Sequence, residues 1–511
     1  MGSTTIKVFP ESKVEGLLEI IDKVRLEYNK KLDESTRGQK GQFMTPASIA
    51  KIMANLFDSL DDNINIIDAG AGVGSLTAAV IERALRDFSP SSITATVWEN
   101  EEILTKALDE TFQQCNLMSS SYNTPFFGEI KREDFISSAV SIIESYRRGN
   151  ATLRFNKAIL NPPYLKIGST SSERKLLKKV GVETGNLYSC FVSLALMILE
   201  DGGELVAITP RSFCNGPYFS DFRRILLDGN NLKKIKVFES RTKAFKEDRV
   251  LQENVIFHII KGQEQGNVEI SSLTCADDPN PIVRNSLFKD VVIPTNPDRF
   301  IHIVSNDEQA LIARKIGGMP CCLADLGIEV STGRVVDFRT KGNLRAYIDD
   351  NSIPLIYPMH FDKGVIKWPI DNSKKMNALA YNGETKSQTV PNGFYVLTKR
   401  LTSKEERRRV VAAVYSPEIA DVDFVGFENK TNYFHAYGLP LDRDLARGLC
   451  IYLNSSMVDS YFRQFNGHTQ VNASDLRNLR YPSKEVLIKL GSDAICFESH
   501  VIDELVEALY K

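Results

Sequence analysis

The sequence of 511 residues has little of what a metal centre or a disulfide framework needs. Its eight cysteines include no Cys-x-x-Cys pair, and the adjacent Cys321 and Cys322 suit neither a zinc site nor an easy disulfide. The six histidines are scattered, and no two of them have the His-x-x-x-His spacing of a metal site. We therefore expect reduced thiols and no bound metal ion.

Long apolar runs are also missing. The longest, residues 191–199, is interrupted by Ser193 and is typical of a buried helix, whereas roughly 20 apolar residues are needed to span a bilayer. The start of the chain lacks the charged-then-apolar pattern of a secretion signal. These absences predict a cytoplasmic protein with no membrane partner.

The chain has almost no net charge, with 63 basic and 65 acidic residues. This balance excludes a globally basic nucleic-acid coat, but a basic groove on one face stays possible because phosphate binding needs only local charge. Hydrophobic residues make up 42%, as in ordinary globular proteins. At roughly 150 residues per domain, the length allows two to four domains.

Strand and helix patterns alternate over the first half of the chain, which predicts an α/β fold with a mainly parallel sheet and helices on both faces. Two late strands follow without a helix between them and predict an antiparallel edge, with residues 268–270 completing a hairpin. The turn-rich stretch at 265–300 predicts a domain boundary. We expect an N-terminal amphipathic helix within 1–35, a catalytic domain over 36–275 and a mixed α/β domain over 300–511. The individual elements expected are helices at 11–34, 47–60, 76–88, 102–114, 136–148, 189–199 and 219–227, and strands at 64–68, 93–98, 126–130, 158–160, 204–209, 232–238 and 254–260.

A glycine-rich turn joins the first strand to the next helix. Asp68 ends the strand, and Gly70, Gly72 and Gly74 follow with the spacing Gly-x-Gly-x-Gly. Glycines permit a sharp turn and let backbone amides approach a ligand closely. The spacing differs from the dinucleotide pattern and suits a ligand without phosphate, whose carboxylate and ammonium meet the amides and Asp68. Glu99, at the end of the following strand, is predicted to accept hydrogen bonds from two ribose hydroxyls.

The turn Asn-Pro-Pro-Tyr at 161–164 follows a strand at the edge where open α/β sheets place their chemistry. Two prolines stiffen the backbone and remove two amide donors, which leaves the Asn161 side-chain oxygen and the Pro162 carbonyl as acceptors. Fixed acceptors suit an exocyclic amine, because they stabilise the positive charge that grows on its nitrogen during attack on an electrophile. Tyr164 offers a flat face on which a base can stack.

The three motifs at 41–46, 68–74 and 161–164, in this order, resemble the gamma-class N6-adenine DNA methyltransferases of type II restriction–modification systems. The resemblance covers most of residues 36–265. It implies a Rossmann-like domain that uses S-adenosyl-L-methionine, followed by a C-terminal target-recognition domain. It also implies that Phe43 and Thr45 help bind the cofactor, although Thr45 before Pro46 also fits a helix cap.

The resemblance implies three further roles. Asp134 accepts from the amino group of the cofactor adenine, with Phe135 beside it. Phe245 lies near the place where the family carries an aromatic partner for the flipped base, and a core role for Phe245 is an equal alternative. The implied partner is double-stranded DNA. A restriction endonuclease acts on the same site without needing to bind this chain, which we expect to be a monomer or a weak dimer.

Two segments of the second domain are candidates for DNA contact. The basic stretch 399–409 is predicted to contact phosphates through Lys399, Arg400, Arg407 and Arg408, and a solvated charged face is the alternative. In the segment 465–472, Gln470 and Asn472 are predicted to reach base edges, because amides pair well with adenine. The alternative there is a loop that caps the following helix through Asn472 or Ser474.

The sequence thus predicts a site-specific methyltransferase that flips an adenine out of duplex DNA and methylates N6. Two alternatives stay open. The same turn occurs in enzymes that methylate RNA or a protein glutamine amide, and the chain can instead be a modification subunit that depends on a separate specificity subunit. A fused nuclease is disfavoured because no convincing nuclease motif is present, and a pure binding module would not need the acceptor turn.

Overall fold

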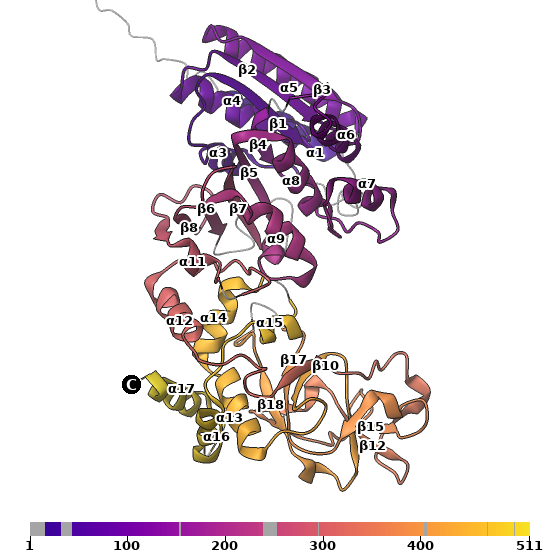
Figure 1. Ribbon diagram of the computed structural model, residues 1–511. Coiled ribbons are helices and arrows are strands. Elements are labelled where there is room, and N and C mark those ends of the chain that lie inside the picture. Colours follow the sequence, from indigo (N-terminus) through magenta and orange to yellow (C-terminus); the bar gives the residue numbers. More distant parts are fainter. Residues whose placement is uncertain are drawn as a thin grey trace, which may run out of the picture. The chain divides into compact units, whose positions relative to one another are not determined.

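The computed structural model describes residues 16–31, 43–152, 155–238, 253–294, 296–402, 406–467, 469–494 and 496–510. The chain divides into two compact units (Figure 1). The first unit holds the described residues up to Pro210 together with Asp221–Asn285, and the second holds Arg211–Ser220 and the described residues from Ser286 onward. The short segment Arg211–Ser220 therefore leaves the main sheet of the first unit and packs with the second.

A nine-stranded mixed sheet forms the centre of the first unit, with the order β3-β2-β1-β4-β5-β7-β6-β8-β9. The first five strands pair in parallel, and β7 runs antiparallel to both of its neighbours, as the sequence predicts for the late strands. The strands are β1 (Asn63–Ala69), β2 (Ser92–Trp98), β3 (Phe126–Lys131), β4 (Phe155–Leu160), β5 (Leu199–Pro210), β6 (Asn230–Phe238), β7 (Asn254–Lys261), β8 (Val268–Leu273) and β9 (Ile282–Ser286).

Helices cover this sheet because their apolar stripes match alternate residues of the strands. Helices α1, α3 and α4 share one buried cluster with every second residue of β1, namely Ile64 and Ile66. Helix α8 contacts β1, β4 and β5 and lies outside that cluster. The helices are α1 (Leu17–Lys31), α3 (Ala47–Ala54), α4 (Ser75–Asp87), α5 (Glu102–Ser121), α6 (Phe135–Arg147), α7 (Ser172–Val180), α8 (Leu187–Ile198) and α9 (Ser220–Leu227).

Two expectations for this unit are wrong, and one helix was not predicted. The hairpin predicted at 268–270 does not form, because β8 pairs in parallel with β6, through Lys234 and Glu269. The helix predicted to run to residue 60 ends at Ala54, although Leu60 is still buried in the same cluster. Helix α7 was not predicted, because four Lys or Arg residues in its nine positions conceal its short apolar stripe.

The second unit is mixed α/β, with a six-stranded sheet, a five-stranded sheet and helices beside them. Helices α13 and α16 cross so closely that a Cβ on Gly448 would lie 1.7 Å from the Leu487 carbonyl oxygen. The strands are β10 (Glu329–Thr332), β11 (Leu344–Arg345), β12 (Ser352–Ile356), β13 (Phe361–Asp362), β14 (Val365–Ile366), β15 (Ala378–Ala380), β16 (Thr389–Pro391), β17 (Tyr395–Lys399), β18 (Ala412–Tyr415), β19 (Phe424–Phe427) and β20 (Thr431–His435). The helices are α11 (Phe288–Val291), α12 (Asp307–Gly317), α13 (Arg443–Leu453), α14 (Ser456–Phe465), α15 (Ala473–Arg477), α16 (Lys484–Asp493) and α17 (Ser499–Glu507).

None of the helices in the described part of the chain combines the length and the apolar character that crossing a membrane requires.

Candidate functional site

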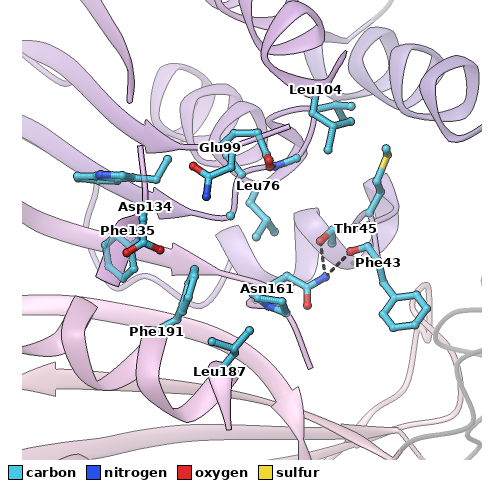
Figure 2. Close-up of a pocket in the computed structure, with 18 of the residues that line it drawn as sticks. Phe43, Thr45, Leu76, Glu99, Leu104, Asp134, Phe135, Asn161, Leu187 and Phe191 are labelled. Carbon is cyan, nitrogen blue, oxygen red and sulfur yellow. Dashed lines mark hydrogen bonds between the residues drawn. The ribbon is translucent and has the colours of Figure 1, made fainter. Parts of the chain in front are cut away.

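A cavity of about 350 Å³ lies at the carboxyl ends of the parallel strands β1, β2 and β4 (Figure 2). The size is in the range of small-molecule sites. Of the residues predicted to bind a cofactor, those that line the cavity are Phe43, Thr45, Gly70, Gly72, Glu99, Asp134 and Phe135. Asn161 also lines it, so the glycine turn and the Asn-Pro-Pro-Tyr turn face one space. Neither Asp68 nor Gly74 is part of the lining.

The charge of the cavity wall is negative. The side chains of Glu99, Glu133, Asp134 and Glu173 line it, and no Lys, Arg or His does so among the described residues. Such a wall favours a cationic ligand and disfavours the phosphates of a dinucleotide. It is therefore compatible with a ligand that carries ammonium and sulfonium groups.

Glu99 is held rigidly at the end of β2. Its Oε2 accepts from the Gly72 amide at 3.0 Å, and its Oε1 accepts from the Glu101 amide at 2.9 Å. The side chain is 6% exposed, and burial raises its pKa. A carboxylate has about four lone-pair sites, so beside its bonds to backbone amides the group can still accept from the cavity side.

The amides of the glycine turn are largely occupied. The Gly70 and Ala71 amides both donate to the Trp98 carbonyl, at 2.9 and 3.1 Å, and the Gly74 amide donates to Ala71. With the Gly72 amide on Glu99, these donors are not available to a ligand, which departs from the predicted contact with a carboxylate. The glycines are needed for the backbone conformation of the turn. Gly70, Gly72 and Gly74 have φ values of 75°, 59° and 85°, in the left-handed region that favours glycine.

Asp68 lies beneath this turn and is fully buried. Its Oδ2 accepts from the Thr77 hydroxyl at 2.8 Å, and its Oδ1 has no hydrogen-bond partner among the described residues. Asp68 is separated from the cavity lining in this conformation, and its contact with a ligand stays a prediction. Burial raises the pKa of Asp68 from 3.8 to about 7.

The raised pKa of Asp68 predicts a pH-dependent stability. A carboxyl group whose pKa is higher in the folded state stabilises the fold fully below its unfolded pKa, and this contribution is lost as the pH rises through about 7. Asp68→Asn does not titrate, so the free energy of unfolding of this variant should increase relative to that of the wild type as the pH rises from about 4 toward 7. Urea unfolding followed by Trp98 fluorescence, in a Trp368→Phe background, measures the difference. An equal difference at pH 5 and pH 8 would contradict the assignment.

Aromatic side chains form one wall of the cavity. Phe135 packs edge-on against Trp98 at 5.2 Å between ring centroids, and Phe191 of α8 lies 5.0 Å from Phe135. Phe191 was not among the predicted site residues. The sequence placed Phe191 only in an expected buried helix at 189–199, a pattern that indicates no contact with a cofactor.

Asp134 marks the start of α6. Its Oδ2 accepts from both the amide and the hydroxyl of Ser137, each at 2.8 Å, so the carboxylate caps the helix. The residue is exposed and lines the cavity, and among the described residues no donor reaches its Oδ1. Asp134 can therefore cap α6 and still accept from a ligand.

The Asn161 side chain is fixed by three hydrogen bonds. Its Nδ2 donates to the Phe43 carbonyl and to the Thr45 hydroxyl oxygen, both at 3.0 Å, as Figure 2 shows. Its Oδ1 accepts from the Tyr164 hydroxyl at 2.9 Å. The sequence predicted the acceptor but not its partners, two of which, Phe43 and Thr45, belong to a segment more than a hundred residues upstream.

The rest of the Asn-Pro-Pro-Tyr turn is only partly available for contact. Pro162 is buried, and within the part of the chain that the structure describes no donor bonds to its carbonyl. The Tyr164 ring is half-buried, 6.2 Å from the Phe43 ring, and burial holds the pKa of its hydroxyl well above the usual value, so it stays a donor. Phe245 and Gln42 lie outside the described residues.

A second polar cluster, Asp58, Glu204 and His258, has ligand atoms within 4.8 Å of one another. Glu204 bonds to Lys157 at 2.5 Å and to His258 at 2.8 Å, and Asp58 bonds to Lys234 at 2.8 Å. Burial alone would raise the pKa values of both carboxyl groups, but these partners lower them to about 2. The lysines already balance the acids, so the cluster is an ion-pair network rather than a metal site.

The basic stretch predicted to contact DNA does not form one surface. Arg407 is exposed, whereas Arg408 is partly buried, 3.8 Å from Asp503. Lys399 and Arg400 lie at the end of β17, where the Arg400 guanidinium donates to the Asn429 carbonyl. Arg409 is 1% exposed and is therefore buried inside the second unit. Of these residues, Arg407 agrees best with the alternative that the stretch is a charged face exposed to solvent.

The segment 465–472 mainly supports the second unit from within. Asn472 forms a capping box with the buried Asp475 at the start of α15, as the capping alternative predicts, and its contact with a base edge stays a prediction. Asp475 also accepts from Asn215, in the segment that follows β5. Gln470 is exposed and remains a candidate for base contact, and His468 lies outside the described residues.

Comparisons with known proteins show which family this chain resembles. A family model described as the Eco57I restriction-modification methylase matches residues 55–245. The type II methyltransferase M.PstI of Providencia stuartii is 51% identical, covering 95% of this chain and 96% of its own length. The type II methyltransferase M.BsuBI of Bacillus subtilis is 45% identical, covering 93% of each chain.

Among solved structures, the cryo-EM structure of a DrdV–DNA complex matches with a TM-score of 0.51 at 11% identity. The match covers 93% of this chain but 59% of that one, and at this identity it shows the fold alone. The two sequence relatives carry the family assignment, because each is matched over nearly its whole length. The chain belongs to the type II methyltransferase family of restriction–modification systems.

Proposed function

We propose that this protein transfers a methyl group from S-adenosyl-L-methionine to N6 of an adenine flipped out of duplex DNA, at a specific sequence. The methylation would protect host DNA from the restriction endonuclease that cleaves the same sequence. The observation that carries the proposal is the fixed amide of Asn161, which borders the cavity and is followed by Pro162, whose carbonyl accepts no hydrogen bond from the residues that the structure describes.

The cavity fits the cofactor in charge and in the kinds of groups it offers. Glu99 would accept the ribose hydroxyls, and Asp134 would accept from the adenine amine. Phe135 and Phe191 would contact the adenine ring. The acidic wall would favour the positive sulfonium, which when bound supplies an electrophilic methyl group. Asp68 would stabilise the glycine turn through its hydrogen bond with Thr77.

The amine of adenine is a poor nucleophile because its lone pair is delocalised into the ring. Asn161 Oδ1 and the Pro162 carbonyl would each accept one N6 hydrogen, which favours a pyramidal nitrogen with its lone pair exposed. As positive charge grows on N6, these fixed dipoles stabilise the transition state more than the ground state. Tyr164 would stack on the base, and Phe245 is proposed as a second aromatic partner.

The second unit is proposed as the target-recognition domain. Its size and its position after the catalytic residues support this role, and Arg407 and Gln470 are its most exposed candidates for contact with DNA. Because this unit is large, we propose that the chain recognises its sequence without a separate specificity subunit. If so, the purified chain alone retards a specific duplex in a gel-shift assay, and a requirement for a second protein would contradict this point.

The proposal is tested with tritiated cofactor and separate DNA, RNA and protein fractions, followed by digestion of labelled DNA to nucleosides. We expect the label in duplex DNA. After digestion to nucleosides, we expect it in N6-methyl-2′-deoxyadenosine. Label in a protein glutamine, in RNA, or on N4 of cytosine would each contradict the proposed substrate. Absence of label in every fraction would contradict the proposed activity as a whole.

A further inference from the structure

The two ends of a primary amide have nearly the same shape, so its neighbours decide which end faces a substrate. We propose that Thr45 is a positioning residue that keeps the Asn161 oxygen, and not its nitrogen, available to the substrate amine. The inference rests on the proposed function and assigns to Thr45 a role in the transfer step beyond any contact with the cofactor.

The Phe43 carbonyl specifies the orientation of the Asn161 amide, and the hydroxyls of Thr45 and Tyr164 complete the hydrogen bonds of that orientation. On the nitrogen side, the Phe43 carbonyl can only accept, and the Thr45 hydroxyl oxygen accepts the second hydrogen, both at 3.0 Å. On the oxygen side, Tyr164 donates at 2.9 Å. A rotated amide would set its oxygen against the Phe43 carbonyl, and two acceptors without a hydrogen between them repel each other.

The Thr45 side chain is available to position Asn161 because it does not cap the helix that follows it. It precedes Pro46, the residue at the N-terminal cap of α3, and its hydroxyl does not cap that helix, because the Ala47 amide of the first turn donates to the Asp22 carboxylate at 3.0 Å. The capping alternative for Thr45 is therefore wrong. Its backbone is anchored through the neighbouring Met44, which packs in a buried cluster with Val73 of the glycine turn and Leu104 of α5.

The hydroxyl of Thr45 also faces the cofactor side. Its oxygen accepts from Asn161, so its own hydrogen must point elsewhere, and no acceptor for that hydrogen is present among the described residues. Thr45 is 5% exposed and lines the cavity, so an acceptor such as a carboxylate of the bound cofactor would take this hydrogen. That bond would fix the hydroxyl as an acceptor toward Asn161, and cofactor and base binding would then favour each other.

The test compares Thr45→Val, which keeps the shape of the side chain, with Thr45→Ser, which keeps the hydroxyl. At saturating cofactor and DNA, we expect Thr45→Val to lower kcat by about 10- to 100-fold, because small errors of position cost that much. Thr45→Ser should recover most of the lost rate. S-adenosylhomocysteine should tighten duplex binding by the wild type and by Thr45→Ser, but not by Thr45→Val.

The matched control is Thr105→Val. Thr105 is a buried threonine of α5 whose hydroxyl donates to the Glu102 carbonyl outside the cavity, and we expect its kcat to equal that of the wild type. An unchanged kcat in Thr45→Val, or an equal loss in Thr45→Ser, would overturn the inference while leaving the proposed function intact. A wild type that labels no DNA would instead overturn the proposed function and, with it, this inference.

Discussion

Replacing Asn161 with alanine is expected to remove methyl transfer while cofactor binding survives. The variant loses the side-chain acceptor, and removal of one fixed group that stabilises transition-state charge costs about 100- to 1,000-fold in kcat. Asn161 is one of many residues that line the cavity. We therefore expect the dissociation constant of S-adenosylhomocysteine, measured by calorimetry, to change by less than about fivefold, the worth of one neutral hydrogen bond.

The control for this variant is Asn116→Ala, on the exposed face of α5. Its transfer rate should match that of the wild type. If Asn161→Ala kept more than a tenth of the wild-type kcat, the acceptor role would be refuted. If it bound DNA normally but no longer bound cofactor, its loss of activity would reflect the cavity wall and not the chemistry.

The second large effect is expected at Glu99, on cofactor affinity. Both of its oxygens are fixed by backbone amides and can accept from the cavity, and hydrogen bonds to a charged group contribute about 1.5–3 kcal/mol each. Losing two such bonds in Glu99→Ala should weaken S-adenosylhomocysteine binding by at least about 100-fold. Calorimetric titration of the full chain measures this directly.

Glu102→Ala is the matched control, because Glu102 begins α5 in the same loop and its carboxylate forms an exposed ion pair with Lys106. Binding by this variant should be unchanged. A Glu99→Ala protein that binds the ligand as tightly as the wild type would show that the ribose is held elsewhere. Loss of kcat alone, with affinity retained, would equally contradict the assigned role.

The sequence predicted much of the cavity because chain connectivity determines where strand ends lie. Gly70, Glu99 and Asn161 each follow a parallel strand, and the carboxyl ends of neighbouring parallel strands meet at one edge of a sheet. The short motif at 43–45 was located by resemblance, since nothing in its local pattern indicates that it contacts Asn161.

Other features depend on contacts that a sequence does not encode locally. The amides of Gly70 and Ala71 are taken by the Trp98 carbonyl, which belongs to the neighbouring strand. The pairing of β8 with β6 requires a choice among several possible partners, and no turn specifies it. In the second unit, Arg409 is buried while Arg407 is exposed, so a run of like charges predicted a surface that the fold divides.

The central claim is that an amine is held by two oxygens of a rigid turn beside the cofactor cavity. The most direct measurement is the structure of the chain bound to S-adenosylhomocysteine and a duplex that it methylates. The account predicts one adenine outside the helical stack, with N6 about 3 Å from both Asn161 Oδ1 and the Pro162 carbonyl oxygen. An adenine that stays stacked in the duplex, or an N6 bound by other groups, would contradict it.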